Sequence, residues 1–224
     1  MKFSDTELGI LKNFAGINPS MVIYPDRLEV INNTKTIVGK YKFDNPYGFD
    51  SFGIYEVTEL LQAVGAFKDA DIDVQTKRLV IKDGGAKITY YTTPSELCPN
   101  VPDIDKKFAT VDCELDFSLP AEKLATIFKM ASVLKAEFVF FETDEKDNGI
   151  RITVAKEKDS TANAFDIVIR EGIRSNTLGK GVIKMAVSEL KILPGDYDVK
   201  ISSKKITKWG SYTGVEYYIG CNVI

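Results

Sequence analysis

One pattern of secondary-structure signals recurs along the chain and constrains the fold more than any other feature. It is clearest between residues 111 and 155, where a short alternating strand at 113–117 leads into a helix. Ser118 and Pro120 mark the start of this helix, because serine caps free backbone N–H groups and proline is tolerated in the first turn. Apolar residues then recur at helical spacing as far as Leu134, where we expect the helix to end.

A β-hairpin is predicted directly after this helix. Residues 137–142 and 150–154 both have strand character, and Asn148-Gly149 lies between them. Asn-Gly between two such runs is a strong hairpin signal, because both residues tolerate the positive φ angles of a tight turn. The unit is therefore a strand, a helix and a pair of strands.

Three weaker copies of this unit fill the rest of the chain. They share the order of elements but not the sequence, so the repeat is one of pattern only. One copy has a strand at 52–57, a helix from Leu60 to Phe67 and strands at 72–74, 79–81 and 88–91. Another has a strand at 182–185, a short helix at 187–192 and strands at 197–201 and 215–222. The N-terminal copy has a helix capped by Ser4 and Glu7, followed by strands at 21–24, 28–31 and 36–41. Four such units predict an α+β protein.

A proline-rich segment divides the four units into two pairs. The chain has 224 residues, which suits one large domain or two of roughly 100 residues. Between residues 93 and 110, Pro94, Pro99 and Pro102 interrupt a polar run, and proline removes the hydrogen-bond donors that a strand or helix needs. We therefore expect a first domain at 1–92, a linker at 93–110 and a second domain at 111–224.

The composition removes several classes of function. The chain contains no histidine, which excludes His-based acid–base catalysis, Ser-His and Cys-His nucleophiles and the commonest zinc ligand. Its three cysteines are scattered without a CxxC pair, so neither a disulfide framework nor a thiolate metal site is expected. We expect no cofactor and no metal, and an enzyme would have to rely on carboxylates.

The net charge of −3 counts against nucleic-acid binding through an open surface, because such proteins are usually basic. No run approaches the roughly 20 apolar residues of a membrane span, and no export signal opens the chain. We therefore expect a cytoplasmic protein without membrane contact.

Four stretches carry residue types that could support chemistry, and we expect each to be structural. Asp69, Asp71 and Asp73 alternate as on a solvated strand face rather than converging on a metal. Residues 144–149 lack two calcium ligands, and residues 179–181 lack phosphate-loop spacing, so both are interpreted as turns. Trp209 lies among lysines, where a hairpin tip is favoured over a stacking patch for nucleic acid.

Two segments resemble a known family. Residues 11–18 (LKNFAGIN) and 193–197 (LPGDY) resemble the DNA polymerase sliding clamps of T-even-type tailed bacteriophages, with the helix from Ala121 and the stretch from 52 to 74 in matching order. This resemblance implies the DNA-clamp fold, with two similar domains each built from two strand-helix-strands units. It further implies a homotrimeric ring around duplex DNA, with helices lining the ring and sheets outside, acting in the cytoplasm of the infected host.

A ring also reconciles the acidic charge with DNA. A clamp is trapped on DNA topologically, so an acidic exterior that repels phosphate is compatible with a modestly positive bore. The implied function is to tether the replicative DNA polymerase for processive synthesis, without catalysis. Two alternatives remain: a cytosolic α+β protein-interaction module that does not encircle DNA, and a carboxylate-dependent enzyme. Trimers in solution would favour the clamp, monomers the interaction module, and metal-dependent turnover the enzyme.

The helix faces opposite the apolar stripes are the predicted DNA-facing surface. They carry Lys12, Lys123, Lys129 and Lys191, with the last on the predicted short helix at 187–192. These lysines should contact phosphates without reading sequence. A solvated helix face remains the alternative for each of them.

Two strands without proline are predicted to join the subunits. Residues 86–91, with Ile88 and Tyr90, and residues 164–170, with Phe165, Ile167 and Ile169, should be sheet edges that pair between subunits.

Partner docking is implied by the resemblance to lie beside the linker and the C-terminal strand. The apolar residues there are Leu97, Val101, Pro102, Ile104, Phe108, Val223 and Ile224. The implied partners are the polymerase, the ATP-driven clamp loader and transcription factors. The alternative is that Phe108 and Ile224 pin the linker and the tail to the domains.

Overall fold

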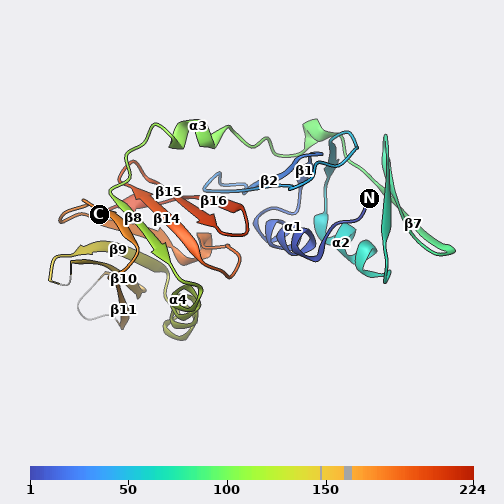
Figure 1. The fold of residues 1–224 in the computed structure, drawn as a ribbon. Coiled ribbons are helices and arrows are strands. Elements are labelled where there is room, and N and C mark those ends of the chain that lie inside the picture. Colours follow the sequence, from blue (N-terminus) through green and yellow to red (C-terminus); the bar gives the residue numbers. More distant parts are fainter. Residues whose placement is uncertain (147, 159–162) are drawn as a thin grey trace. The chain divides into compact units, whose positions relative to one another are not determined.

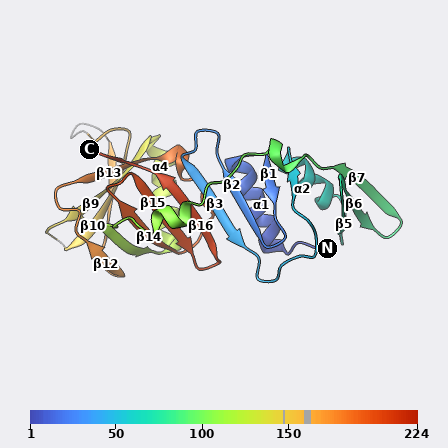
Figure 2. The ribbon, with the colours of Figure 1, turned by 90° about the horizontal axis from the view of Figure 1, so that it is seen from above.

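The computed structural model describes residues 1–146, 148–158 and 163–224. The chain divides into two compact units, Met1–Pro102 and Asp103–Ile224, each with its own strands and helices. Figure 1 and Figure 2 show these elements from two directions. No helix in the described ranges is long and apolar enough to cross a membrane.

The first unit contains two α-helices and two sets of antiparallel strands. One set has the order β3-β2-β1-β4, and the other has the order β5-β6-β7. Helices α1 and α2 lie side by side (Figure 1). The elements are α1 (Asp5–Ile17), β1 (Met21–Ile23), β2 (Arg27–Ile31), β3 (Ile37–Lys42), β4 (Phe52–Ile54), α2 (Val57–Gly65), β5 (Asp71–Gln75), β6 (Arg78–Asp83), β7 (Ala86–Tyr91) and the 3₁₀ turn η1 (Ser95–Leu97).

Helix α1 begins at the predicted capping box. The Ser4 hydroxyl accepts a hydrogen bond from the Glu7 amide, and the Glu7 carboxylate accepts one from the Ser4 amide. Buried residues at helical spacing, including Phe14, attach the helix to the sheet. Phe14 lies so close to Gly39 of β3 that a Cβ there would be 2.8 Å from its Cε1 atom. Glycine is therefore required at this strand position.

The second unit has two strand sets whose apolar faces meet. One set has the order β12-β8-β14-β15-β16 and the other β11-β10-β9-β13-β17. The Phe141 ring of β9 contacts Phe117 of β8 and Trp209 of β15, so these strand sets share a core. The elements are α3 (Ile104–Phe108), β8 (Leu115–Leu119), α4 (Ala121–Leu134), β9 (Phe138–Asp144), β10 (Gly149–Ala155), β11 (Ala164–Ile169), β12 (Ile173–Asn176), β13 (Val182–Ala186), the 3₁₀ turn η2 (Val187–Glu189), β14 (Tyr197–Ser202), β15 (Ile206–Ser211), β16 (Val215–Gly220) and β17 (Asn222–Val223).

The predicted helix at 187–192 is wrong. Only the 3₁₀ turn η2 forms there, and no side chain caps its start. A segment this short has little helix stability of its own, and Leu190 and Ile192 are instead buried individually. Lys191 therefore does not lie on a helix.

Both interpretations of Trp209 are also wrong. Trp209 is only 1% exposed, lies within β15 and donates from its indole nitrogen to the Thr207 hydroxyl at 2.9 Å. A buried indole cannot stack on a base. The strand was missed because lysines and Gly210 interrupt its apolar alternation.

Candidate nucleic-acid interface

The predicted DNA-facing lysines that belong to helices lie on the sides of those helices that face solvent. Lys12 on α1 and Lys129 on α4 are exposed, and Lys123 on α4 is half-buried. The apolar stripes beneath them, with Leu11 on α1 and Ile127 on α4, are buried. Lys191 is exposed but follows η2, so the structure places three of the four lysines on helices.

Three of the predicted DNA-facing lysines lack the ion pairs that several lysines on or beside the strands make. Within the described ranges, Lys12, Lys123 and Lys129, and Lys68 just after α2, make no ion pair with a carboxylate. Lysines paired with carboxylates on or beside the strands are Lys40, Lys82, Lys156, Lys158, Lys200 and Lys208. A phosphate can therefore approach the helix lysines without breaking an existing pair.

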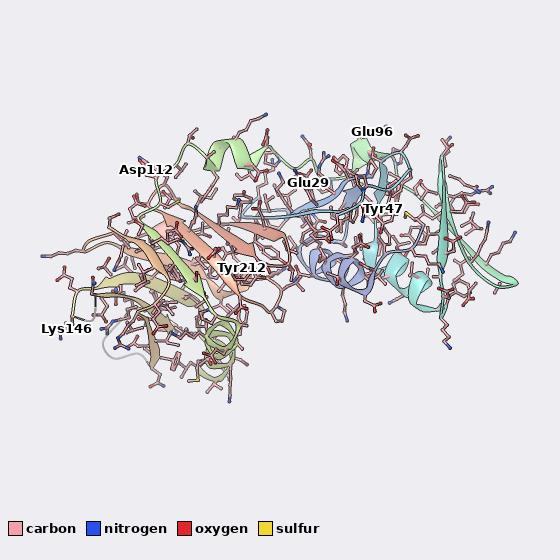
Figure 3. The ribbon with its side chains drawn as sticks, in the orientation of Figure 1. Glu29, Tyr47, Glu96, Asp112, Lys146 and Tyr212 are labelled. Carbon is pink, nitrogen blue, oxygen red and sulfur yellow. The ribbon has the colours of Figure 1, made fainter. Side chains whose placement is uncertain are left out.

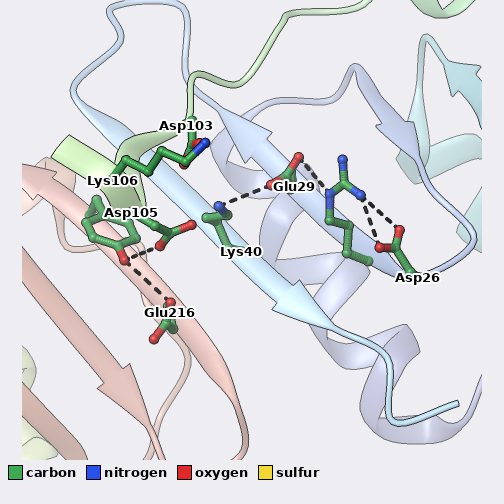
Figure 4. A network of polar contacts seen from close by, with 9 residues as sticks. Asp26, Glu29, Lys40, Asp103, Asp105, Lys106 and Glu216 are labelled. Carbon is green, nitrogen blue, oxygen red and sulfur yellow. Dashed lines mark hydrogen bonds and ion pairs between the residues drawn. The ribbon is translucent and has the colours of Figure 1, made fainter. Parts of the chain in front are cut away.

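A cluster on β2 and β3 illustrates these paired cations. The Glu29 carboxylate lies 3.2 Å from the Arg27 guanidinium and 3.3 Å from the Lys40 ammonium (Figure 4). Asp26 also contacts Arg27, at 2.9 Å. Each cation here already has an anionic partner, so this surface offers little attraction to phosphate.

Both strands predicted to join subunits are edge strands in their units. Strand β7, with Ile88 and Tyr90, pairs with β6, and β11, with Phe165, Ile167 and Ile169, pairs with β10; within the parts of the chain that the structure describes, neither has a second neighbour. Tyr90 donates to the Glu56 carbonyl at 3.0 Å, and Ile169 is buried. The other three side chains are half-buried, as they would be in a strand whose outer side is open.

The predicted docking residues fall into three separate settings. Leu97 is 71% exposed in η1, and Val101 follows it half-buried in the first unit. Ile104 and Phe108 belong to α3. The tail residues Val223 and Ile224 are 40% and 59% exposed. They lie beside β13, where Val223 pairs with Ile183 and the Ile224 amide donates to the Val182 carbonyl.

Phe108 attaches helix α3 to the second unit. Its ring packs edge-on against Tyr218 of β16, with the ring centroids 5.5 Å apart. The Tyr218 hydroxyl donates to the Asp105 carboxylate at 2.5 Å (Figure 4). Burial, followed by this hydrogen bond, raises the pKa of Tyr218 above its ordinary value, so the phenol stays protonated.

A pocket of about 360 Å³ lies beside this contact, between α3 and the strands β14–β16. Tyr212, labelled in Figure 3, lines it and is 71% exposed. Tyr218 was not predicted as a functional residue, whereas Tyr212 was expected beside Trp209 in the possible stacking patch. Alternation in β16 could have indicated that adjacent Tyr217 and Tyr218 point to opposite faces.

The alternating aspartates at 69, 71 and 73 are engaged in separate ion pairs. In the described ranges no group of histidine, cysteine and carboxylate side chains is arranged to hold a metal ion. Asp69, Asp71 and Asp73 pair with Lys2, the Met1 ammonium and Lys82, respectively.

The expected turn at 144–149 includes Asp147, which lies outside the described residues. Asp144 closes β9 and pairs with Arg151. The expected turn at 179–181 is confirmed, with Gly179 at φ +65°.

The chain is similar to a phage clamp over its whole length. No protein-family model matches it. It is 26% identical over 226 residues to the sliding clamp of Vibrio phage KVP40, and the match covers 100% of both sequences. The resemblance seen in the sequence is therefore confirmed.

Solved structures of clamps have the same fold. The proliferating cellular nuclear antigen (PCNA) of Entamoeba histolytica has a TM-score of 0.68 at 11% identity, covering 96% of this chain and 94% of that one. PCNA of A. fulgidus, bound to the C-terminal region of FEN-1, has a TM-score of 0.67 at 11% identity, covering 97% and 95%. The DNA polymerase III β subunit of Pseudomonas aeruginosa has a TM-score of 0.63 at 12% identity, covering 96% of this chain but 62% of that one. The predicted α+β DNA-clamp fold is confirmed.

Proposed function

We propose that this chain, a sliding-clamp homologue by sequence and fold, is one subunit of a closed homotrimer that encircles duplex DNA and tethers a DNA polymerase for processive synthesis. The observation that carries the proposal is the end-to-end similarity to the Vibrio phage clamp. In this proposal, clamp domains at 1–92 and 111–224 are joined by the linker at 93–110. The protein acts by topology and tethering rather than by catalysis.

The two edge strands supply the proposed contact between subunits. A ring needs a heterologous interface, in which one surface of a subunit meets a different surface of the next. Strands β7 and β11 provide one open edge in each unit. Pairing β7 of one subunit with β11 of the next would satisfy backbone donors and acceptors that otherwise invite aggregation.

The helix lysines supply the proposed contact with DNA. Because Lys12, Lys123 and Lys129 have no carboxylate partner in the described ranges, they can exchange between phosphates as the ring moves. Each contact is weak and reads no base, which suits sliding. Lys191 is included because it is exposed, although it acts from a loop.

The proposed docking site takes short peptide segments. The A. fulgidus clamp binds the C-terminal region of FEN-1, which is recognition of this kind. In this chain we assign docking to the linker residues Leu97, Val101, Ile104 and Phe108 and to the tail, Val223 and Ile224. A few apolar anchors within a charged rim suffice for peptide binding. The polymerase, an ATP-driven loader and transcription factors would bind at these residues.

Molar mass in solution tests the ring. Light scattering behind a sizing column should give three times the 24.9 kDa mass of the chain across a wide range of protein concentration. A monomer at every concentration would contradict the proposal and favour a simple interaction module.

A further inference from the structure

A pocket of about 500 Å³ lies in the first unit, on three segments of chain that backbone hydrogen bonds hold together. The Thr92 amide donates to the Lys77 carbonyl at 3.0 Å, which joins the end of β7 to the β5–β6 turn. Gly53 of β4 and Thr93 exchange two backbone hydrogen bonds, at 3.1 and 2.8 Å. A Cβ on Gly53 would lie 2.5 Å from the Thr93 carbonyl oxygen. The walls are therefore fixed before a ligand binds, which lowers the ordering cost of binding.

Five residues that line this pocket carry hydroxyl groups with no partner in the protein. Within the described ranges, none of these hydroxyls makes a hydrogen bond to another residue. By contrast, the Ser4 hydroxyl caps α1 and the Thr207 hydroxyl bonds to the Ile219 carbonyl. The five residues are Ser51, Thr76, Thr92, Thr93 and Ser95. Their hydroxyls can donate to acceptor atoms of a ligand.

One aromatic ring and one cation complete the chemistry of the pocket. The Tyr91 side chain is 73% exposed and makes no ring contact or hydrogen bond within the described ranges. Lys77 has no carboxylate partner there either. No aspartate or glutamate is among the described residues that line the pocket, although the chain contains 32 of them. The pocket thus offers an aromatic face, hydrogen-bond donors and a positive charge, but no anionic acceptor.

An extended peptide that contains proline matches this chemistry. A polyproline II helix has no internal hydrogen bonds, so its carbonyl groups are all available as acceptors. Proline itself has no N–H group, so such a segment is rich in acceptors and poor in donors. Segments of this kind bind to grooves lined by aromatic side chains. The unpaired ammonium of Lys77 favours an acidic residue beside the prolines.

Single-stranded nucleic acid fits this pocket less well. A base could stack on the exposed ring of Tyr91. However, a strand carries one charge at each phosphate, and its affinity comes mainly from cations that neutralise several of them. Lys77 is the only cation among the described residues that line the pocket, and the chain has a net charge of −3. The observations therefore favour the peptide.

We propose that this pocket binds an acidic, proline-containing segment of a partner protein in the polyproline II conformation. A proline ring packs on Tyr91, and an aspartate or glutamate of the segment pairs with Lys77. The site goes beyond the proposed function, because none of the proposed docking residues lines it and it does not depend on a ring. Tyr91 and the half-buried Tyr90 alternate along β7, so they point to opposite faces of the sheet. Pairing of the β7 edge with another subunit thus leaves the Tyr91 ring accessible.

A charge swap tests the proposal with two fluorescein-labelled peptides and the full-length protein. One probe is Pro-Pro-Asp-Pro-Pro-Asp-Pro-Pro, and the other has lysine in place of both aspartates. Fluorescence anisotropy should show tighter binding of the aspartate peptide. Lys77→Glu should weaken that binding by about two- to fivefold, as expected for one exposed ion pair, and strengthen binding of the lysine peptide. Misfolding cannot strengthen binding of one peptide, so an unchanged order of affinities would overturn the proposal.

Removal of the aromatic ring gives an independent result. Tyr91→Ala should weaken binding of the aspartate peptide by about tenfold or more, because aromatic anchors dominate interfaces of this kind, and Tyr91→Phe should retain it. Tyr212→Ala is the matched control, since Tyr212 is 71% exposed but belongs to the second unit. Thermal melts and light scattering verify that each variant keeps its fold and its oligomeric state. Equal losses in Tyr91→Ala and Tyr212→Ala, or no loss in either, would contradict the assignment.

Two further probes identify other occupants. Equal binding of a proline-free glycine–aspartate peptide of the same length and charge would overturn the proposal, because charge alone would then explain the affinity. Binding of labelled oligothymidylate that is lost in Tyr91→Ala, without binding of the aspartate peptide, would make the pocket a site for single-stranded nucleic acid. Light scattering on the same samples separates this proposal from the clamp: a trimer that does not bind the peptide rejects only the pocket, and a monomer that binds it rejects only the ring.

Discussion

At the scale of single residues, glycine has opposite consequences at two positions. Gly9→Ala should raise the free energy of unfolding by about 0.5–1 kcal/mol, because alanine is the better helix former and its Cβ meets nothing within 4 Å. Gly39→Ala should lower it, because the new Cβ would lie 2.8 Å from Phe14. Urea unfolding at fixed protein concentration measures both. A destabilised Gly9→Ala variant would contradict the account of α1.

Glu114 links stability to pH. Burial tends to raise the pKa of its carboxyl, but hydrogen bonds from the Ser203 hydroxyl and from the Ser203 amide at 2.8 Å outweigh it, so the pKa lies below the usual value of 4.5. A carboxyl with a depressed folded pKa stabilises the protein above its unfolded pKa and loses that contribution as pH falls through the folded pKa.

Glu114→Gln should therefore be destabilised at neutral pH and converge on the parent protein in acid. The difference should be below about 1 kcal/mol, because solvent screens a partly exposed carboxylate. Urea unfolding from neutral pH down to about pH 3 measures it. A difference that stays constant across this range would show that the carboxylate charge does not matter.

At the scale of elements, two proline variants at neighbouring positions can show which backbone N–H groups of β11 face its open edge. Neighbouring residues of an antiparallel strand point their N–H groups to opposite sides, and Asp166 and Ile167 pair with Thr153 and Ile152 of β10. Of Asp166→Pro and Ile167→Pro, one should break the trimer with little loss of unit stability, and the other should weaken β10–β11 pairing. Light scattering and thermal melts separate these effects. Intact trimers in both variants would exclude β11 as the interface.

The tail strand β17 gives a second test at this scale. Removing Val223 and Ile224 deletes backbone pairing to β13, so the melting temperature should fall. If the tail also forms part of the docking surface, affinity for a polymerase C-terminal peptide should fall too. Phe108→Ala is the comparison, because it removes the ring contact with Tyr218 but leaves β17 intact. Unchanged peptide binding after truncation would make the tail purely structural.

Local signals predicted the elements that depend on local chemistry. Helices α1 and α4 and the hairpin formed by β9 and β10 are confirmed, although Gly149 belongs to β10 rather than to the turn. Asn148 adopts a positive φ of 47°, and Lys135 ends α4 with a positive φ of 49°. These features follow from capping and turn preferences within a few residues. The lysine-bearing faces of α1 and α4 were likewise predictable from local sequence, because they lie opposite the apolar stripes.

Long-range contacts were beyond the reach of sequence patterns. Strand β12 was not predicted, because only Ile173 is strongly apolar. The strand is held by its pairing with β8, which includes the ion pair of Arg174 with Asp116. The α3 attachment joins Asp105 to Tyr218, which are 113 residues apart. Neither partner carries a local signal for the other, so only the folded chain shows the contact.

At the scale of the whole molecule, charge on the helices should control contact with DNA. Replacing Lys12, Lys123, Lys129 and Lys191 by alanine should shorten the products of processive synthesis at physiological salt and weaken its salt dependence, with the trimer unchanged. A matched control replaces four exposed lysines outside the helices, Lys42, Lys77, Lys180 and Lys204. Equal loss in both variants would attribute the effect to net charge alone.

Topological retention on DNA tests the central claim most directly. The trimer is loaded onto nicked circular DNA with the loader and ATP, and is then passed through a sizing column at high salt. We predict that it travels with the circle and is released when one cut linearises the DNA, because only a closed ring is held by topology. Retention that survives linearisation, or that never exceeds retention on linear DNA, would contradict the account.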